Sequence, residues 1–168
     1  MGFPVVNRNN REYILAQQSK VYPSDIFDTN GTSIVEITLL DNTQISIGIK
    51  THFVLHNLHQ NGQATTIELN LGKGTMQTIL KDQQTLELGT PLATVVVKGG
   101  GFYARYAAST LEIVMLEEGA MKVSNGNGNA NINSPSHGTT VIAGSAPQIP
   151  TLWSNRKIQR LIKQTFIE

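Results

Sequence analysis

Three histidines, His52, His56 and His59, have the spacing in this sequence that comes nearest to a metal site. On a helix that spacing would place all three on one side, as metal sites require. The surrounding residues predict a strand instead, on which His52 and His56 share a face but lie two pairs apart, while His59 falls at a turn. We therefore expect solvent-facing histidines and no metal site.

The motif Gly72-Lys73-Gly74-Thr75 has the composition of a phosphate-binding loop. Such a loop needs four residues between its first glycine and a Gly-Lys-Ser/Thr end, and a helix must follow. Here a second glycine follows the lysine, and a predicted strand follows both. The motif therefore predicts a β-bulge and not a nucleotide site.

Other groups that could act in catalysis lack suitable neighbours. The adjacent carboxylates Glu117 and Glu118 would point to opposite faces of a strand, so they cannot act on one substrate; they are typical of a charged turn before Gly119. Ser145 is not part of a Gly-x-Ser-x-Gly elbow, and His137 lies in a predicted surface loop. We expect no catalytic residue, no metal and no cofactor, and hence no enzyme.

Length, composition and net charge exclude several further kinds of site and partner. The chain of 168 residues is long enough to bury a substantial core, and it contains no cysteine, which excludes a disulfide scaffold, a thiolate zinc site and a cysteine nucleophile. Its net charge of +1 gives no long-range field for nucleic acid, so we expect no nucleic-acid partner. Residues 1–7 show no signal-peptide pattern, and no apolar run approaches the roughly 18 residues that span a bilayer.

Short strands dominate the chain up to about residue 145, because apolar and polar residues alternate there between turn dipeptides. The predicted strands cover residues 11–15, 33–40, 44–49, 52–58, 65–71, 76–80, 86–88, 103–106, 111–116, 120–123, 131–133 and 139–143. Asp41-Asn42 predicts a hairpin turn, whereas residues 125–131, rich in asparagine and glycine, predict a flexible loop. Strands at this spacing are typical of a sandwich, barrel or solenoid.

The glycine triplet Gly99-Gly100-Gly101 lies between two apolar strand-like runs. Glycine tolerates a positive φ and a close approach of another backbone, so the triplet predicts a sharp bend inside a buried sheet.

The stretch around this triplet resembles the core motif of the FecR-type domain, an extracytoplasmic all-β module of bacteria. In that family an apolar strand leads into a basic-Gly-Thr-x-Phe turn, and a later Leu-Glu-Gly turn precedes a valine-rich strand. The corresponding residues here are Lys98-Gly99-Gly100-Gly101-Phe102 and, within 112–123, Glu118-Gly119. Shorter matches at 21–29, 40–45 and 141–144 extend the resemblance over about residues 11–146.

Three residues depart from the family pattern: Gly100 replaces the usual threonine, and Ser24 and Asn42 replace usual glycines. All three suit turns, so we expect the fold to be retained. The resemblance implies an extracytoplasmic location, in the periplasm, at the cell surface or in the medium. Well-known members of the family are membrane-anchored regulators that relay signals from outer-membrane receptors to sigma factors, but the anchor is not seen here, so that role is not carried over.

The last segment has a different pattern. From residue 152 to 167, apolar residues recur at helical spacing beside a basic face, and Ser154 is suited to cap the helix. The residues proposed to bind a partner on this helix are Trp153, Ile158, Leu161, Ile162 and Phe166. The apolar face of this helix could cover the chain's own β core or dock on a protein partner. Alternatively, its basic face could contact an acidic membrane; we favour the first two possibilities.

The sequence thus predicts an all-β, FecR-like domain over residues 1–146, built as a twisted sandwich or solenoid of many short strands. A linker over 147–151 and an amphipathic helix over 152–168 complete the chain. We expect a non-enzymatic module for protein interaction or assembly. One version of this interpretation is a self-associating filament or surface subunit that uses its β edges and the helix. The alternative is a sensor domain of a cell-surface signalling system that recognises a receptor segment or a glycan.

Overall fold

A computed structural model describes residues 3–62 and 64–166 of the chain, and the elements below belong to those residues. They form one antiparallel sheet of thirteen strands and one helix. In chain order the elements are β1 (Val5–Arg8), β2 (Arg11–Ile14), β3 (Ile26–Asp28), β4 (Val35–Thr38), β5 (Gln44–Ile47), β6 (His52–Asn61), β7 (Ala64–Gly89), β8 (Thr94–Ala107), β9 (Thr110–Met115), β10 (Ala120–Asn125), β11 (Gly128–Ile132), β12 (His137–Ile142), β13 (Thr151–Leu152) and α1 (Asn155–Phe166). The prediction of an all-β fold with one C-terminal helix is confirmed.

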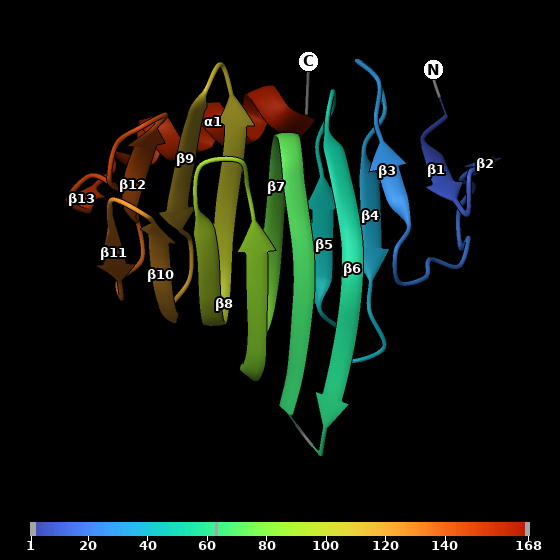
Figure 1. Ribbon diagram of the computed structural model, residues 1–168, viewed down its shortest axis with the longest axis horizontal. Coiled ribbons are helices and arrows are strands. Elements are labelled where there is room, and N and C mark those ends of the chain that lie inside the picture. The colour runs from blue at the N-terminus through green and yellow to red at the C-terminus, as the bar shows by residue number, and fades with distance from the viewer. Residues whose placement is uncertain (1–2, 63, 167–168) are drawn as a thin grey trace.

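The sheet branches at its two longest strands. The main path runs β13-β12-β9-β8-β7-β6-β3-β1-β2, while β5 and then β4 branch from β7, and β10 and then β11 branch from β8. The first part of β7 pairs with β6, whereas residues 76–79 pair with β5. The sheet therefore curls, and β4 and β5 lie behind β6 (Figure 1).

The core fills the space inside this curl. Its fully buried side chains alternate along the strands and include Phe27, Phe53, Ile45, Ile47 and Leu71. The rings of Phe27 and Phe53 stand 6.0 Å apart, on the paired strands β3 and β6. Burial of these apolar side chains is the main stabilising contribution to the fold.

The glycine triplet bends the sheet as predicted. Gly99 and Gly100 have φ angles of 62° and 77°, which are costly for any residue with a Cβ. The pairing of β7 with β8 shifts here, between Leu80 and Thr85, because residues 81–84 of β7 bulge out opposite Gly99. The predicted bulge at Gly72 is also present, as His52 pairs with Lys73 while Phe53 pairs with Leu71.

Two local predictions were wrong. The separate strands 65–71, 76–80 and 86–88 form one continuous strand, β7, because bulges let the chain bend while its pairing continues. The predicted flexible loop at 125–131 is a hairpin between β10 and β11, in which Asn125 pairs with Gly128. Asn125 orders the turn, because its side chain accepts the N–H of Asn127 and donates to the carbonyls of Leu92 and Ser145.

Helix α1 lies on the outer face of the sheet (Figure 1). Ile158 and Leu161 of α1 form a small apolar cluster with Trp153 and with Tyr103 and Val114, whose side chains point away from the main core. The helix begins at Asn155 and not at residue 152, because the Ser154 hydroxyl accepts the N–H of Lys157. Within the described residues no helix has the length and apolar character needed to cross a membrane.

Tyr103 links α1 to the sheet and makes the fold sensitive to alkaline pH. Its ring is fully buried, and its hydroxyl lies 2.8 Å from the Thr165 hydroxyl. Burial raises the pKa of Tyr103, and the Thr165 hydrogen bond opposes this only in part. The unfolded chain therefore ionises this phenol first, near a pH of about 10, and the stability that Tyr103 contributes is lost as the pH rises further.

We expect the Tyr103→Phe variant to lose this alkaline dependence. Below a pH of about 9 it should be less stable than the wild type by about 1 kcal/mol, since one hydrogen bond is missing. Above a pH of about 10 that difference should shrink or reverse. The test is the melting temperature of the wild type and of the variant as a function of pH, because every other titratable group is present in both proteins. If the two curves of melting temperature against pH are parallel, Tyr103 ionises equally in the folded and unfolded chains.

Candidate functional site

An apolar groove of about 1040 Å³ opens where β4 faces the loop that joins β2 to β3. One wall is this loop, residues 15–23, hereafter the loop wall. The other wall is β4 with its flanks, residues 34–40, hereafter the edge strand. Leu55 and Leu58 of β6 also line the groove, which therefore reaches between the two layers of the curled sheet.

The edge strand presents free main-chain groups to the groove side. β4 pairs with β5 alone. The N–H of Leu39 donates to the Thr43 carbonyl, so Leu39 directs its main-chain groups to β5. Because this direction alternates along an antiparallel strand, Ile37 and Val35 do the same. The main-chain groups of Glu36 and Thr38 consequently point outward. In the part of the chain that the structure describes, no hydrogen bond engages them.

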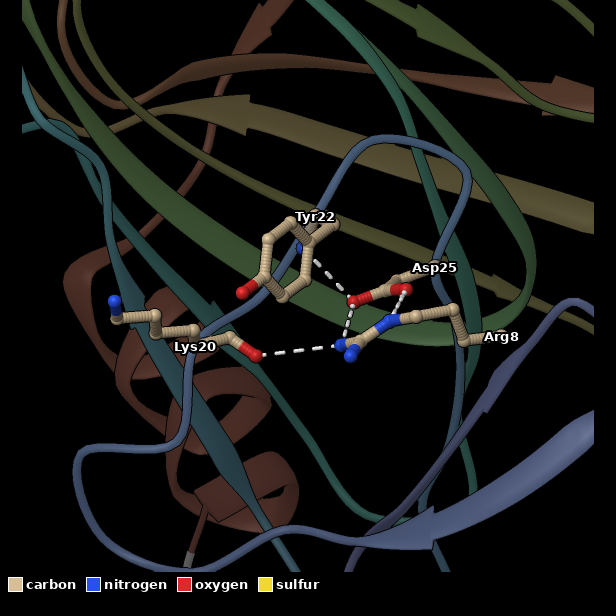
Figure 2. Close-up of polar contacts among 4 residues, drawn as sticks. All are labelled: Arg8, Lys20, Tyr22 and Asp25. Carbon is tan, nitrogen blue, oxygen red and sulfur yellow. Dashed lines mark hydrogen bonds and ion pairs between the residues drawn. The ribbon is translucent and has the colours of Figure 1, made fainter.

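A partly buried ion pair fixes the loop wall (Figure 2). Asp25 is fully buried, and both of its oxygens accept from the Arg8 guanidinium at 2.7 Å. The same carboxylate accepts the N–H of Tyr22 at 2.8 Å, and Arg8 also donates to the Lys20 carbonyl. Two-point binding of a carboxylate by arginine fixes both distance and orientation, so the groove is formed before any partner arrives.

The Arg8 guanidinium is also held by aromatic rings. Its central carbon lies 4.4 Å from the ring centre of Tyr22 and 5.3 Å from that of Tyr13. The hydrogen bond to Asp25 raises the pKa of Arg8 above its ordinary value, which is already high. Arg8 therefore stays charged at every pH at which the protein folds.

A tight turn lies at each end of the groove, and each turn contains a residue with a positive φ. Asp25 N–H donates to the Tyr22 carbonyl across Pro23 and Ser24, and Ser24 has a φ of 72°. Asn42, with a φ of 66°, closes the predicted Asp41-Asn42 hairpin between β4 and β5. Both positions have a positive φ, which suits the glycines that the resembling family has there; asparagine tolerates this conformation, and Ser24 adopts it here.

The residues of the predicted turn motif meet on the opposite part of the sheet. A Cβ on Gly100 would collide with the carbonyl oxygen of Glu118, and one on Gly119 would collide with that of Gly99. Phe102 is fully buried and Gly101 lies inside the sheet, while Lys98 and Glu118 expose their side chains. These residues lie outside the groove lining, and their contacts are those of a packed bend.

The five helix residues predicted to bind a partner are divided by the structure. Trp153, Ile158 and Leu161 are buried against Tyr103 and Val114 of the chain's own sheet. Ile162 and Phe166 are partly exposed. Docking of this helix on a partner stays a prediction, and it would have to use the exposed remainder of the helix or displace the helix from the sheet.

All three histidines lie on β6 and do not converge; the prediction that His59 falls at a turn was wrong, because β6 continues to Asn61. His52 Nδ1 contacts the Asp28 carboxylate across the β3–β6 pair at 2.7 Å, and His59 contacts the Asn57 side chain at 3.0 Å. Among the described residues, no three His, Asp or Glu side chains gather closely enough to hold a metal ion.

The groove was not predicted from the sequence. Its signal was present, because Ile34 and Leu40 place apolar side chains on the face of the edge strand that also carries Glu36. In the structure Leu40 is fully exposed and Ile34 is 42% exposed. Exposed apolar residues that flank an apolar groove are characteristic of interaction sites.

Comparison with family models matches residues 25–122 to the family described as FecR protein. The match covers more than half of the 168 residues, begins at Asp25 and includes the whole edge strand. The chain belongs to the FecR protein family. The resemblance inferred from the motifs is therefore confirmed.

This FecR-family chain is similar in fold to a candidate anti-sigma factor from Parabacteroides distasonis, seen in two crystal structures. The TM-scores are 0.65 and 0.64, at 14% sequence identity, over 82% of this chain and 64% of the other. At this identity the similarity concerns the fold alone, and the chain spans less than two thirds of those proteins. No curated protein matches the chain in sequence.

Proposed function

We propose that this chain is a non-enzymatic protein-recognition domain of a bacterial signalling system, located outside the cytoplasm, and that the groove is its binding site. The observation that carries the proposal is the groove itself: it is large, apolar, held open by the Arg8–Asp25 pair, and bordered by a strand with unpaired main-chain groups. Membership in the FecR protein family supports a signalling role, as does the fold of a candidate anti-sigma factor.

Photo-crosslinking tests the proposal in the native host cell. We would place p-benzoyl-phenylalanine at Leu40, which is fully exposed on the groove rim, and, as the control, at Ile149, which is 87% exposed and does not line the groove. A discrete adduct with a membrane or envelope protein from position 40, and none from position 149, is the expected result. Equal labelling at both positions, or none at either, would contradict recognition through the groove.

Self-association is a second candidate function, and one observation favours it. The edge strand β4 has an unpaired side, and such edges can pair with a second copy of the same chain. Light scattering after size exclusion decides between the two functions. A mass near 18.3 kDa, the mass of one chain, would exclude a self-assembling subunit, whereas large species or fibres would favour it over the signalling domain.

A further inference from the structure

We propose that the groove takes an extended polypeptide strand, which adds to the free side of β4, places alternate apolar side chains in the groove and sets a lysine or arginine beside Glu36. This inference rests on the proposed function and names the chemistry of its partner. Four features of the site lead to it.

The first feature is the set of free main-chain groups. Glu36 and Thr38 each direct an N–H and a carbonyl away from β5, with no partner among the described residues. Donors and acceptors that alternate along an edge at strand spacing are matched by the main chain of another strand. A compact small molecule cannot match two such residues, which lie about 7 Å apart along the strand.

The second feature is the pleat of the edge strand. Val35, Ile37 and Leu39 point inward and are nearly buried, between 4% and 8% exposed, while Glu36 and Thr38 point outward. A strand added beside β4 would share this pleat, so every second residue of it would enter the groove. There it would meet Leu55 and Leu58 and the apolar side chains of the loop wall. The occupant must therefore alternate apolar and polar residues.

The third feature is charge. Glu36 is exposed on the outer face of the edge strand, and none of the ion pairs in the described part of the chain includes it. A residue opposite Glu36 on the added strand would have its Cβ about 5 Å away, which suits a basic side chain. Another copy of β4 is a poorer match, because its only charged residue is again Glu36.

The fourth feature is preorganisation. The N–H of Ser24 donates to the Leu55 carbonyl at 2.6 Å, and the N–H of Leu55 donates to the Asp25 carbonyl at 3.1 Å, so the two residues that follow the loop wall are bonded to β6. The wall itself is held by Arg8, which donates to the Lys20 carbonyl. A strand can therefore bind without ordering this wall first, which removes part of the entropic cost of binding.

A labelled octapeptide, KVTVKVTV, serves as the probe, and fluorescence anisotropy measures its binding. The controls are EVTVEVTV and a peptide of the first composition in which the four valines are consecutive. We expect the wild-type protein to bind KVTVKVTV best. The Glu36→Lys variant should reverse the preference between the basic and the acidic peptide, because it reverses the one charge that β4 carries.

Two protein variants test the main-chain pairing. Thr38→Pro removes an outward N–H without disturbing the bonds to β5, and prolines are tolerated at such edge positions. Thr38→Val keeps the N–H. We expect Thr38→Pro to weaken binding by about tenfold and Thr38→Val to bind within about twofold of the wild type, with unchanged melting temperatures.

Two peptides test the same point without altering the protein. One is KVTVKVTV with N-methyl groups on its valines, and the other carries them on its lysines and threonines. Since alternate N–H groups of an added strand face β4, only one of the two should lose affinity. Equal loss in both, or no loss in either, would overturn strand pairing.

The remaining outcomes also decide the question. If no peptide binds while the crosslink at position 40 persists, the groove recognises a partner in another way and the strand inference fails alone. If no crosslink forms and peptides bind only weakly and without alternation, the proposed function fails with it. If Thr38→Pro instead dissolves a dimer seen by light scattering, the occupant is a second copy and the charged-strand inference is wrong.

Discussion

Replacing Gly100 with alanine should lower the free energy of unfolding by about 3 kcal/mol, from backbone strain together with overpacking. Gly100 has a φ of 77°, and a Cβ there would collide with the carbonyl oxygen of Glu118. Neither the peptide of Glu118 nor the bend in β8 can move easily, because the next glycine, Gly101, accepts the N–H of Leu116 at 2.7 Å. Chemical denaturation measures the loss, which corresponds to a melting temperature lower by about 6–12 °C.

Two other glycines of the same chain separate the causes. Gly62 has a φ of 63° with no atom near its Cβ position, so Gly62→Ala should cost only about 1 kcal/mol of backbone strain. Gly126 has open space and no positive φ, so Gly126→Ala should stay within about 0.5 kcal/mol of the wild type. If Gly100→Ala is no worse than Gly62→Ala, the contact with Glu118 does not constrain the bend.

Local turn chemistry could be predicted from the sequence because it depends on a few neighbouring residues. The Asp41-Asn42 hairpin, the bulge at Gly72 and the bend at Gly99 and Gly100 all follow from which residues tolerate a positive φ or an extra position in a strand. The same reasoning failed at residues 125–131. There a polar, glycine-rich stretch forms a hairpin because the Asn125 side chain bonds to carbonyls 33 and 20 residues away.

The groove could not be predicted in this way, since it depends on topology. The alternation of residues 34–40 predicts a strand, but only the pairing order shows that β4 has one neighbour and therefore a free side. The loop wall depends on Arg8, at the end of β1, and on Asp25, just before β3, which are 17 residues apart. Sequence alone gives neither the partner of a charged residue nor the position of a strand within a sheet.

The helix could be predicted because its apolar residues recur at helical spacing. How strongly the helix is attached to the sheet is a separate question. An isolated helix of 12 residues is marginal in water, so α1 needs the sheet to stay folded. Trp153 provides much of that attachment: it is 6% exposed, and its ring lies against Gly138, where a Cβ would be 2.6 Å from Cε2. Lys157 places its ammonium 3.5 Å from the centre of the same ring.

Trp153→Ala should therefore lower the free energy of unfolding by about 3–4 kcal/mol and loosen α1 before the sheet unfolds. Hydrogen exchange should show faster exchange at the α1 amides with little change in β8 and β9. The neighbouring Leu152, which is 69% exposed, gives the control: Leu152→Ala should stay within about 0.5 kcal/mol.

The Trp153→Ala variant also shows whether α1 can dock on the sheet of a second chain. Releasing the helix exposes Tyr103 and Val114, an apolar face that the helix of a second chain could cover. If Trp153→Ala stays monomeric while its α1 amides exchange faster, the helix serves only its own sheet, and the predicted partner-binding role of Ile162 and Phe166 loses its support. If the variant dimerises, the apolar face of α1 can dock in trans, and the packing seen within one chain is one of two arrangements. Unchanged exchange in α1 would show that Ile158 and Leu161 hold the helix without Trp153.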